Sequence, residues 1–361
     1  MSNRKLTILG IVAVLMVIWA YVQSQISNKP RTKPNKPVYL IQGLDPEDIG
    51  SIILGTAENT VTLKQQAGRF VVTNKDNYPA VTGEINELIT KCLDIRTVEL
   101  YTDDKANHKA LGVTEEDARS VVKFFKPDST PLTGVIIGKY KEESQGTYVR
   151  LASNDKVYVT LESPWIKNNA MDYIKQELIT INADDIESVT ITYPNGDYAL
   201  KKENQTIMLE NLAEDKQLKD KEYEQVFKAL TNLRFIDVRK KLAEDEELAF
   251  DRKFICRLKD STTYTISIAQ KDDKTYVTCE AEFMDKTPVT KENVVESEEE
   301  LKKKEAKLLA RDKANEFTTK HRDWIYEIAE YKAKELTKQL SELIEDKKKP
   351  EENKQVNDSN M

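Results

Sequence analysis

Side chains that build metal and catalytic sites are scarce in this sequence. Its 361 residues include two histidines, His108 and His321, and three cysteines, Cys92, Cys256 and Cys279. Three cysteines exclude a disulfide-rich scaffold, and neither residue type has the spacing of a zinc site. Walker, H-E-x-x-H, G-x-S-x-G and G-x-G-x-x-G patterns do not occur. The sequence therefore assigns no catalytic, metal-binding or cofactor-binding residue.

Glycine and proline are also few, with 11 of each, so the chain is not fibrous. Charged residues make up 32% and hydrophobic residues 39%, which is too polar for a protein with many membrane spans. The length suits two domains with a sizeable core each. We expect a folded body with a solvated surface.

One long apolar run occurs, and it lies at residues 6–22, LTILGIVAVLMVIWAYV. As a helix these residues reach roughly 26 Å, enough to span a thin bilayer. Trp19 and Tyr21 lie where an aromatic belt is expected. A cleaved signal peptide is the alternative, but its apolar region is usually only ~7–15 residues long and ends at an A-x-A site, which this sequence lacks. We expect an uncleaved, single-pass transmembrane anchor.

The flanks of this run bear on its orientation. Basic residues lie on both sides, so counting them does not decide the topology. Because residues 1–5 form such a short tail, we expect that tail in the cytoplasm, the anchor in the inner (cytoplasmic) membrane, and the body in the periplasm or otherwise outside the cytoplasm. A body in the cytoplasm is the alternative. Residues 23–37 hold three prolines and four basic residues, and we expect a stiff stalk near anionic headgroups.

The charge balance excludes one class of partner. Residues 1–36 contain six Lys or Arg and no acid, so the net charge of −7 for the whole chain becomes −13 for the rest. An acidic body argues against binding of nucleic acid.

The chain beyond the stalk repeats itself. LDPEDIGSII (44–53) aligns with INADDIESVT (181–190), and at the same offset RFVVTN (69–74) aligns with TIMLEN (206–211). STPLTGVIIGK (129–139) later aligns with STTYTISIAQK (261–271) at a slightly smaller offset. Offsets that change only at loops indicate two tandem copies of one structural unit, which we place at 38–177 and 178–345.

Each copy is predicted to be α+β, a mixed sheet with covering helices. Alternating or β-rich runs predict strands, and apolar residues at helical spacing predict a helix over 83–94 and a closing helix over 166–177. The strands predicted in the first copy are 49–55, 59–65, 69–73, 96–101, 118–125, 132–138, 146–151 and 156–160.

The second copy carries a charged insertion at 285–320. Within it, a capping-box pattern at Ser297 predicts an exposed helix over 298–316. Residues 324–328 then return to the sheet, and a helix is expected over 330–345. The end, 346–361, has no apolar period and is predicted to be a disordered tail.

Two of the cysteines are expected to be free thiols in the core. Cys256 shares a strand face with Phe254 and Leu258, and Cys279 shares one with Val277 and Ala281. If the runs 253–258, 262–268 and 275–281 form a meander, these cysteines lie two strands apart. That separation is roughly 9–10 Å, beyond the ~7 Å reach of a disulfide.

The few candidate chemical groups have plain structural interpretations. Asp103, Asp104 and His108 could hold a divalent cation, but a solvated loop is the stronger expectation because no second histidine is near. His321 lies between Lys320 and Arg322 and is expected to be exposed. The acid pair Asp184-Asp185 matches Glu47-Asp48 of the first copy, which favours a turn or helix cap over catalysis.

Several pieces of the sequence resemble a known family. They are LKQQAGRFVVTNKDNYPA (63–80), RTVELYT (96–102), the step Ala110-Leu111-Gly112-Val113, GVIIGK…GTYVR (134–150) and WIYEIAEYKAKELTKQLSELI (324–344). These pieces resemble the bacterial family called domain of unknown function 4340 over nearly all of 40–345. The resemblance implies a single-anchor envelope protein that is auxiliary to an ABC-type transporter of the gliding-motility kind. It carries no catalytic residue set.

Two functions from different classes follow. The favoured one is a non-enzymatic, membrane-anchored extracytoplasmic binding or scaffold protein, whose partner is the membrane subunit of an ABC-type transporter, with no small-molecule ligand. The alternative is an extracytoplasmic hydrolase that cleaves envelope carbohydrate with carboxylates in a groove between the two copies. An enzyme of that kind needs two inward-facing acids with perturbed pKa values.

Overall fold

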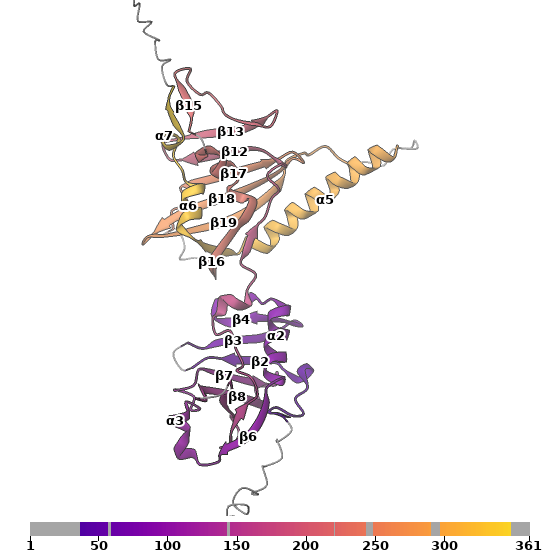
Figure 1. Cartoon of the computed structure of the whole chain (residues 1–361). Coiled ribbons are helices and arrows are strands. Elements are labelled where there is room, and N and C mark those ends of the chain that lie inside the picture. Colours follow the sequence, from indigo (N-terminus) through magenta and orange to yellow (C-terminus); the bar gives the residue numbers. More distant parts are fainter. Residues whose placement is uncertain are drawn as a thin grey trace, which may run out of the picture. The chain divides into compact units, whose positions relative to one another are not determined.

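The chain forms a mixed α and β fold built on large antiparallel sheets. A computed structural model describes residues 37–56, 59–142, 145–219, 221–242, 248–289 and 297–347. The chain divides into two compact units (Figure 1). The first unit contains residues up to 70 together with 82–168, and the second contains 71–81 together with 169 onward.

The first sheet has ten strands whose inward positions are mostly Val, Ile and Leu. Burial alternates along them, as in β2, where Ile52 and Leu54 are fully buried. Its strand order is β1 (Val38–Tyr39), β6 (Arg96–Thr102), β10 (Val157–Thr160), β9 (Thr147–Leu151), β8 (Pro131–Tyr140), β7 (Ser120–Phe125), β2 (Ser51–Leu54), β3 (Val61–Gln66), β4 (Arg69–Val72) and β5 (Tyr78–Pro79).

Helix α2 (Thr82–Leu93) buries one stripe of its surface in the first unit. Ile85, Leu88, Ile89 and Cys92 are all buried at helical spacing. The helix predicted over 83–94 is therefore confirmed within one residue at each end.

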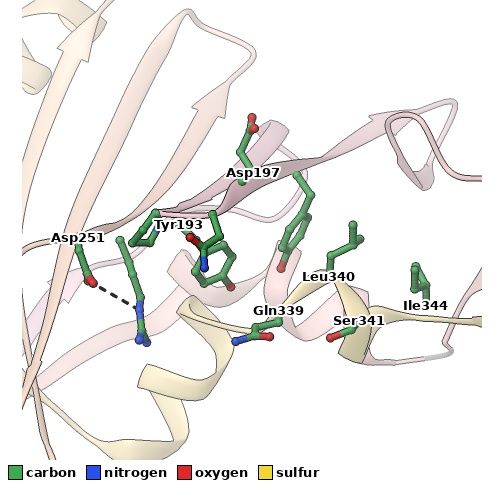
Figure 2. Close-up of a pocket in the computed structure, with 12 residues that line it drawn as sticks. Tyr193, Asp197, Asp251, Gln339, Leu340, Ser341 and Ile344 are labelled. Atoms are coloured by element: carbon green, nitrogen blue, oxygen red, sulfur yellow. Dashed lines mark ion pairs between the residues drawn. The ribbon is translucent and has the colours of Figure 1, made fainter.

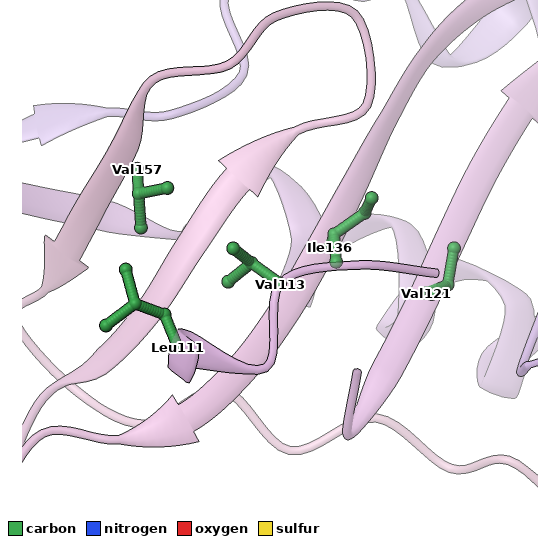
Figure 3. Packing of buried hydrophobic residues seen from close by; sticks show 5 residues of the cluster. All are labelled: Leu111, Val113, Val121, Ile136 and Val157. Carbon is green, nitrogen blue, oxygen red and sulfur yellow. The ribbon is translucent and has the colours of Figure 1, made fainter. Parts of the chain in front are cut away.

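A short helix and the residues after it contribute to an apolar cluster in the first unit. Helix α3 (His108–Leu111) ends at Gly112, whose φ of +66° is the left-handed conformation that favours glycine. Leu111 and Val113 pack with Val121, Ile136 and Val157 (Figure 3). Helix α3 lies so close to β8 that position 138 of this strand requires glycine. A Cβ on Gly138 would lie 2.5 Å from the Leu111 carbonyl oxygen.

The second sheet has nine strands, and its order corresponds strand by strand to the first nine of the other sheet. Helix α4 (Glu222–Phe227) stands where α2 stands in the first unit, before the strand that corresponds to β6. The strand order is β11 (Glu177–Ile179), β16 (Leu233–Lys240), β20 (Trp324–Ile328), β19 (Lys274–Phe283), β18 (Thr262–Lys271), β17 (Arg252–Leu258), β12 (Ile186–Tyr193), β13 (Gly196–Glu203) and β14 (Thr206–Leu209).

Residues 71–81 pack within the second unit through an aromatic cluster and polar contacts. The ring of Tyr78 lies edge-on to Trp324 at 4.7 Å and to Phe235 at 6.0 Å between centroids. Lys75 pairs with Asp237 at 2.5 Å. The segment is therefore part of this unit's core, although its first two residues, Val71 and Val72, are the end of strand β4 of the first sheet.

Helix α5 (Glu298–His321) contacts the sheet mainly through its C-terminal half. Ser297 and Glu300 form the predicted capping box at its start. Near its end the hydroxyl of Thr318 accepts the Ala281 N–H at 2.7 Å and donates to the Ala281 carbonyl. Figure 1 shows the N-terminal part of α5 extending away from the sheet. The helix is five residues longer than the predicted 298–316.

Two predicted helices are wrong. The closing helix expected over 166–177 is a single 3-10 turn, η4 (Ala170–Tyr173), because Ile174 returns to extended backbone. The helix expected over 330–345 breaks into α6 (Glu330–Leu336) and α7 (Leu340–Leu343). The carbonyl of Lys338, between them, accepts hydrogen bonds from two tyrosine hydroxyls.

The chain ends differently from the expected start of a tail at 346. Strand β21 (Ile344–Asp346) pairs with β15 (Lys216–Leu218), so Asp346 is still ordered. The tail expected beyond 347, the tail expected at 1–5, the anchor expected at 6–22 and the stalk expected up to 36 lie outside the described residues. Among the residues that are described, no helix is long and apolar enough to cross a membrane.

Candidate binding pocket

A pocket of about 650 Å³ lies in the second unit, between the β12–β13 hairpin and the segment around α7 (Figure 2). This volume is in the range of small-molecule and peptide sites. The pocket is lined by residues 193–198 of the hairpin, Asp251 and Arg252 at the start of β17, and Gln339, Leu340, Ser341 and Ile344 near the C-terminus.

Two tyrosines fix the wall of this pocket. The hydroxyls of Tyr193 and Tyr198 both donate to the carbonyl oxygen of Lys338, at 2.5 and 2.6 Å. Burial raises the pKa of Tyr193 to about 12 and raises that of Tyr198 further, so both remain neutral donors at physiological pH. The same carbonyl contacts therefore hold the hairpin against the C-terminal segment.

The charged groups of the pocket do not converge. Figure 2 shows the Asp197 carboxylate pointing away from the ring of Tyr193. Asp251 is directed at Arg252, whose Nε lies 3.8 Å from its Oδ1. Arg252 also donates to Gln270 Oε1 at 3.0 Å. This arrangement does not support general acid–base catalysis by Asp197 and Asp251 as a pair. The amide, hydroxyl and apolar groups of the lining can instead contact a bound ligand or peptide.

The sequence did not indicate this pocket. Its two walls lie about 140 residues apart in the chain, and neither wall has a local motif for ligand binding. Only the tertiary pairing of the hairpin with the C-terminal segment creates it.

His321 is buried, which corrects the expectation of an exposed side chain. It is 3% exposed, and its Nδ1 is hydrogen-bonded to the Tyr326 hydroxyl at 2.6 Å. The ring of Phe317 packs against its ring at a tilt of 43°, with centroids 4.5 Å apart. Burial, assisted by the positive charge of Lys320, lowers the pKa of His321 to about 4.

His108 is also buried, which corrects the expectation of a solvated loop around it. Its Nε2 donates to the Asp155 carbonyl oxygen at 2.9 Å. Asp104 instead caps the turn η3 (Lys105–Asn107) by accepting the Ala106 N–H at 2.9 Å. Among the described residues no cluster of three or more His, Cys, Asp or Glu could hold a metal.

The acid pairs Glu47-Asp48 and Asp184-Asp185 lie in turns before β2 and β12, as expected. In the first turn Asp45 accepts the Glu47 N–H at 3.0 Å, and in the second Asn182 accepts the Asp184 N–H at 3.0 Å. Asp184 also pairs with Lys202. The capping side chains are therefore those of Asp45 and Asn182, which precede the turns, and not those of the acid pairs.

All three cysteines are free and buried, which confirms the prediction for Cys256 and Cys279. Strands β17, β18 and β19 form the predicted meander, so β18 separates these two thiols. Burial raises the pKa of Cys92 and of Cys256 to about 12 and also raises that of Cys279. These thiols are core groups, in contrast to reactive nucleophiles.

Fold and site together define a mixed α and β protein of large antiparallel sheets with an open groove in its second unit. The chain belongs to the family described as domain of unknown function (DUF4340), whose model matches residues 71–253. This match is shorter than the span of 40–345 that was expected from the sequence. No curated protein matches the sequence.

Proposed function

We propose that the chain is a non-enzymatic, membrane-anchored binding or scaffold protein of the cell envelope, built from two tandem copies of one α+β unit. The matching order of nine strands in the two sheets supports the duplication. The uncharged run at 6–22 and the stalk at 23–37 support a single anchor with the body outside the cytoplasm.

The observation that carries this proposal is the burial of the histidines and cysteines, the side chains best suited to catalysis or metal binding. His108, His321 and the three cysteines lie in the core, with each histidine in a structural hydrogen bond. The accessible features are instead grooves, exposed apolar side chains and the extended helix α5. Surfaces of this kind bind partners. The sequence resemblance described above suggests the membrane subunit of an ABC-type transporter.

Purification of the intact chain in detergent, followed by mass spectrometry of what remains bound, tests the proposal. We expect a transporter membrane subunit in stoichiometric amount. Hydrolysis of envelope carbohydrate by the purified chain, lost on substitution of a pair of carboxylates, would contradict it and favour the alternative hydrolase.

Helix α5 is the proposed contact for that partner. Leu301 and Leu309 on it are about half exposed, at 53% and 51%. Leu301→Asp combined with Leu309→Asp should reduce recovery of the partner at least tenfold, an effect of about 1.4 kcal/mol or more. Met208→Asp, at an exposed apolar position on β14, is the matched control. Unchanged recovery with the double variant would exclude this face of α5.

A further inference from the structure

Among the described residues, the outermost strand covers only part of the edge of the first sheet. Strand β1 pairs Val38 with Thr97 and Tyr39 with Arg96, and it consists of these two residues. Strand β6 continues to Thr102 and pairs with β10 on its other side. Within the described part of the chain, β6 beyond Thr97 therefore has no strand neighbour on its outer side. An open edge of this kind calls for a covering surface.

Exposed apolar side chains gather at this edge. Of the fifteen large hydrophobic side chains that are exposed among the described residues, six lie on β1, on β6 or just after β10. We call this set the β1/β6 edge. Its members are Val38, Tyr39, Leu100, Tyr101, Leu161 and Trp165, the last with 67% of its surface exposed.

These side chains flank the edge on both faces of the sheet, because successive strand residues such as Leu100 and Tyr101 point to opposite faces. The Arg96 carbonyl, opposite Tyr39, accepts the Leu161 N–H at 2.8 Å. A groove of about 360 Å³ lies beside Tyr39 and Leu100, and a second of about 330 Å³ lies beside Leu161 and Trp165. Both grooves reach β6, the first at residues 97–100 and the second at Arg96.

The charges at this edge compensate each other. Arg96 pairs with Glu162 at 3.4 Å, and Lys141 pairs with Glu99. The Lys141 ammonium also lies 5.8 Å from the centre of the Tyr101 ring. The edge is thus aromatic, with these charges paired and one cation close to a ring, so its contact with lipid does not require anionic headgroups.

The chain reaches this edge directly from the expected anchor. Strand β1 starts at Val38, and only residues 23–37 separate it from the apolar run at 6–22. Fifteen residues span at most ~50 Å when fully extended. The tether therefore ends at the β1/β6 edge itself and holds it at high local concentration near the bilayer.

We propose that the β1/β6 edge rests on the interfacial region of the bilayer, with Trp165, Tyr39 and Tyr101 at the level of the headgroups. Tryptophan and tyrosine favour this region because their rings are apolar while their N–H and O–H groups are solvated. The proposal depends on the membrane anchoring proposed above and adds which surface of the first unit contacts lipid.

Fluorescence of Trp165 in the full-length chain tests this. Trp19→Phe and Trp324→Phe leave Trp165 as the single tryptophan. The chain is reconstituted in phosphatidylcholine vesicles with and without a lipid that carries a nitroxide on its headgroup. We expect Trp165 emission to lie at shorter wavelength than that of an exposed indole and to be strongly quenched by the nitroxide lipid.

A matched control places the indole elsewhere in the same unit. Trp19→Phe, Trp324→Phe and Trp165→Phe combined with Gln65→Trp move the single indole to an exposed position on β3, six strand places from β6 in the sheet order, or roughly 29 Å. We expect emission typical of water and little quenching from this variant.

The outcomes separate the two proposals. If the chain resists carbonate extraction but Trp165 emits as in water without quenching, the edge proposal is overturned and the anchor stands. Emission at short wavelength without headgroup quenching would mean that a protein partner or a second copy covers the edge, which also overturns it. Release of the chain by carbonate would overturn both the anchor and the lipid-facing edge.

Discussion

Nδ1 of His321 lies 2.6 Å from the hydroxyl oxygen of Tyr326 inside the second unit. His321 is in the last turn of α5, and Tyr326 is in β20, the next strand. Their hydrogen bond joins the inserted helix to the sheet, next to the cluster of Tyr78 and Phe235 around Tyr326. The folded structure therefore favours the neutral form of the His321 side chain.

This burial predicts a pH dependence of stability. The pKa of His321 is about 4 in the folded chain, against an ordinary value of 6.5. Between these values the unfolded chain binds a proton that the folded chain does not. Stability therefore falls as the pH drops from 6.5 towards 4. The contribution lost by pH 4.5 is about 2 kcal/mol.

Urea unfolding of the natural chain and of His321→Gln at pH 7 and pH 4.5 measures this contribution. Other groups titrate in both proteins, so the difference between their pH dependences isolates His321. We expect the natural chain to lose about 2 kcal/mol more than the variant. Equal losses would show that His321 is not held neutral.

The buried thiols should be inert in the native chain. The pKa of Cys92 and of Cys256 is about 12 because burial desolvates both thiols. Burial raises the pKa of Cys279 in the same way. Native protein treated with a maleimide at pH 8 should react roughly 10³-fold more slowly than the urea-unfolded chain. Mass spectrometry should show three labels after unfolding and none before it. Rapid native labelling, or a Cys256–Cys279 disulfide, would contradict the strand arrangement.

The contact of α3 with β8 should tolerate no side chain on Gly138. A Cβ there would lie 2.5 Å from the Leu111 carbonyl oxygen and 2.6 Å from Val113. Gly138→Ala should cost about 1–3 kcal/mol of unfolding free energy because the helix must move off the sheet. Gly83→Ala, in α2 with nothing within 4 Å of the new Cβ, should be neutral or stabilising by ~1 kcal/mol. Thermal unfolding of both variants measures the contrast, and equal effects would refute it.

The two tyrosines of the pocket should act together. Each donates to the same Lys338 carbonyl, so Tyr193→Phe or Tyr198→Phe alone leaves that carbonyl one partner. Each single variant should cost ~0.5–1.5 kcal/mol, and the double variant should cost more than the sum. Urea unfolding of all four proteins gives the coupling energy, with exposed Tyr331→Phe as a silent control. Additive losses would show that the hydroxyls do not share the carbonyl.

Alternation and helical spacing predicted much of the fold because they report local burial. Strand β18 illustrates this: Ile266 and Ile268 are fully buried, and the residues between and before them are more exposed. The burial of His321 was missed because its charged neighbours Lys320 and Arg322 suggested solvent. Its own spacing was the better signal, since Ala310, Ala314 and His321 are buried on one face of α5.

The breaks in the last helix and the pocket could not be predicted from the sequence. The apolar period of 330–345 continues across Lys338, and what interrupts the helix is a contact with two tyrosines about 140 residues away. Local patterns carry no information about such partners. The same distance in sequence separates the two walls of the pocket.

Protease digestion of intact spheroplasts tests the central claim most directly, which is that a single anchor at 6–22 holds the body outside the cytoplasm. The full-length chain with a C-terminal epitope is followed by immunoblot, beside a cytoplasmic marker protein that must stay intact. The account predicts loss of the epitope and of the 41.4 kDa band before lysis, with only a small membrane-bound N-terminal fragment left. Full protection until the spheroplasts are lysed would contradict it.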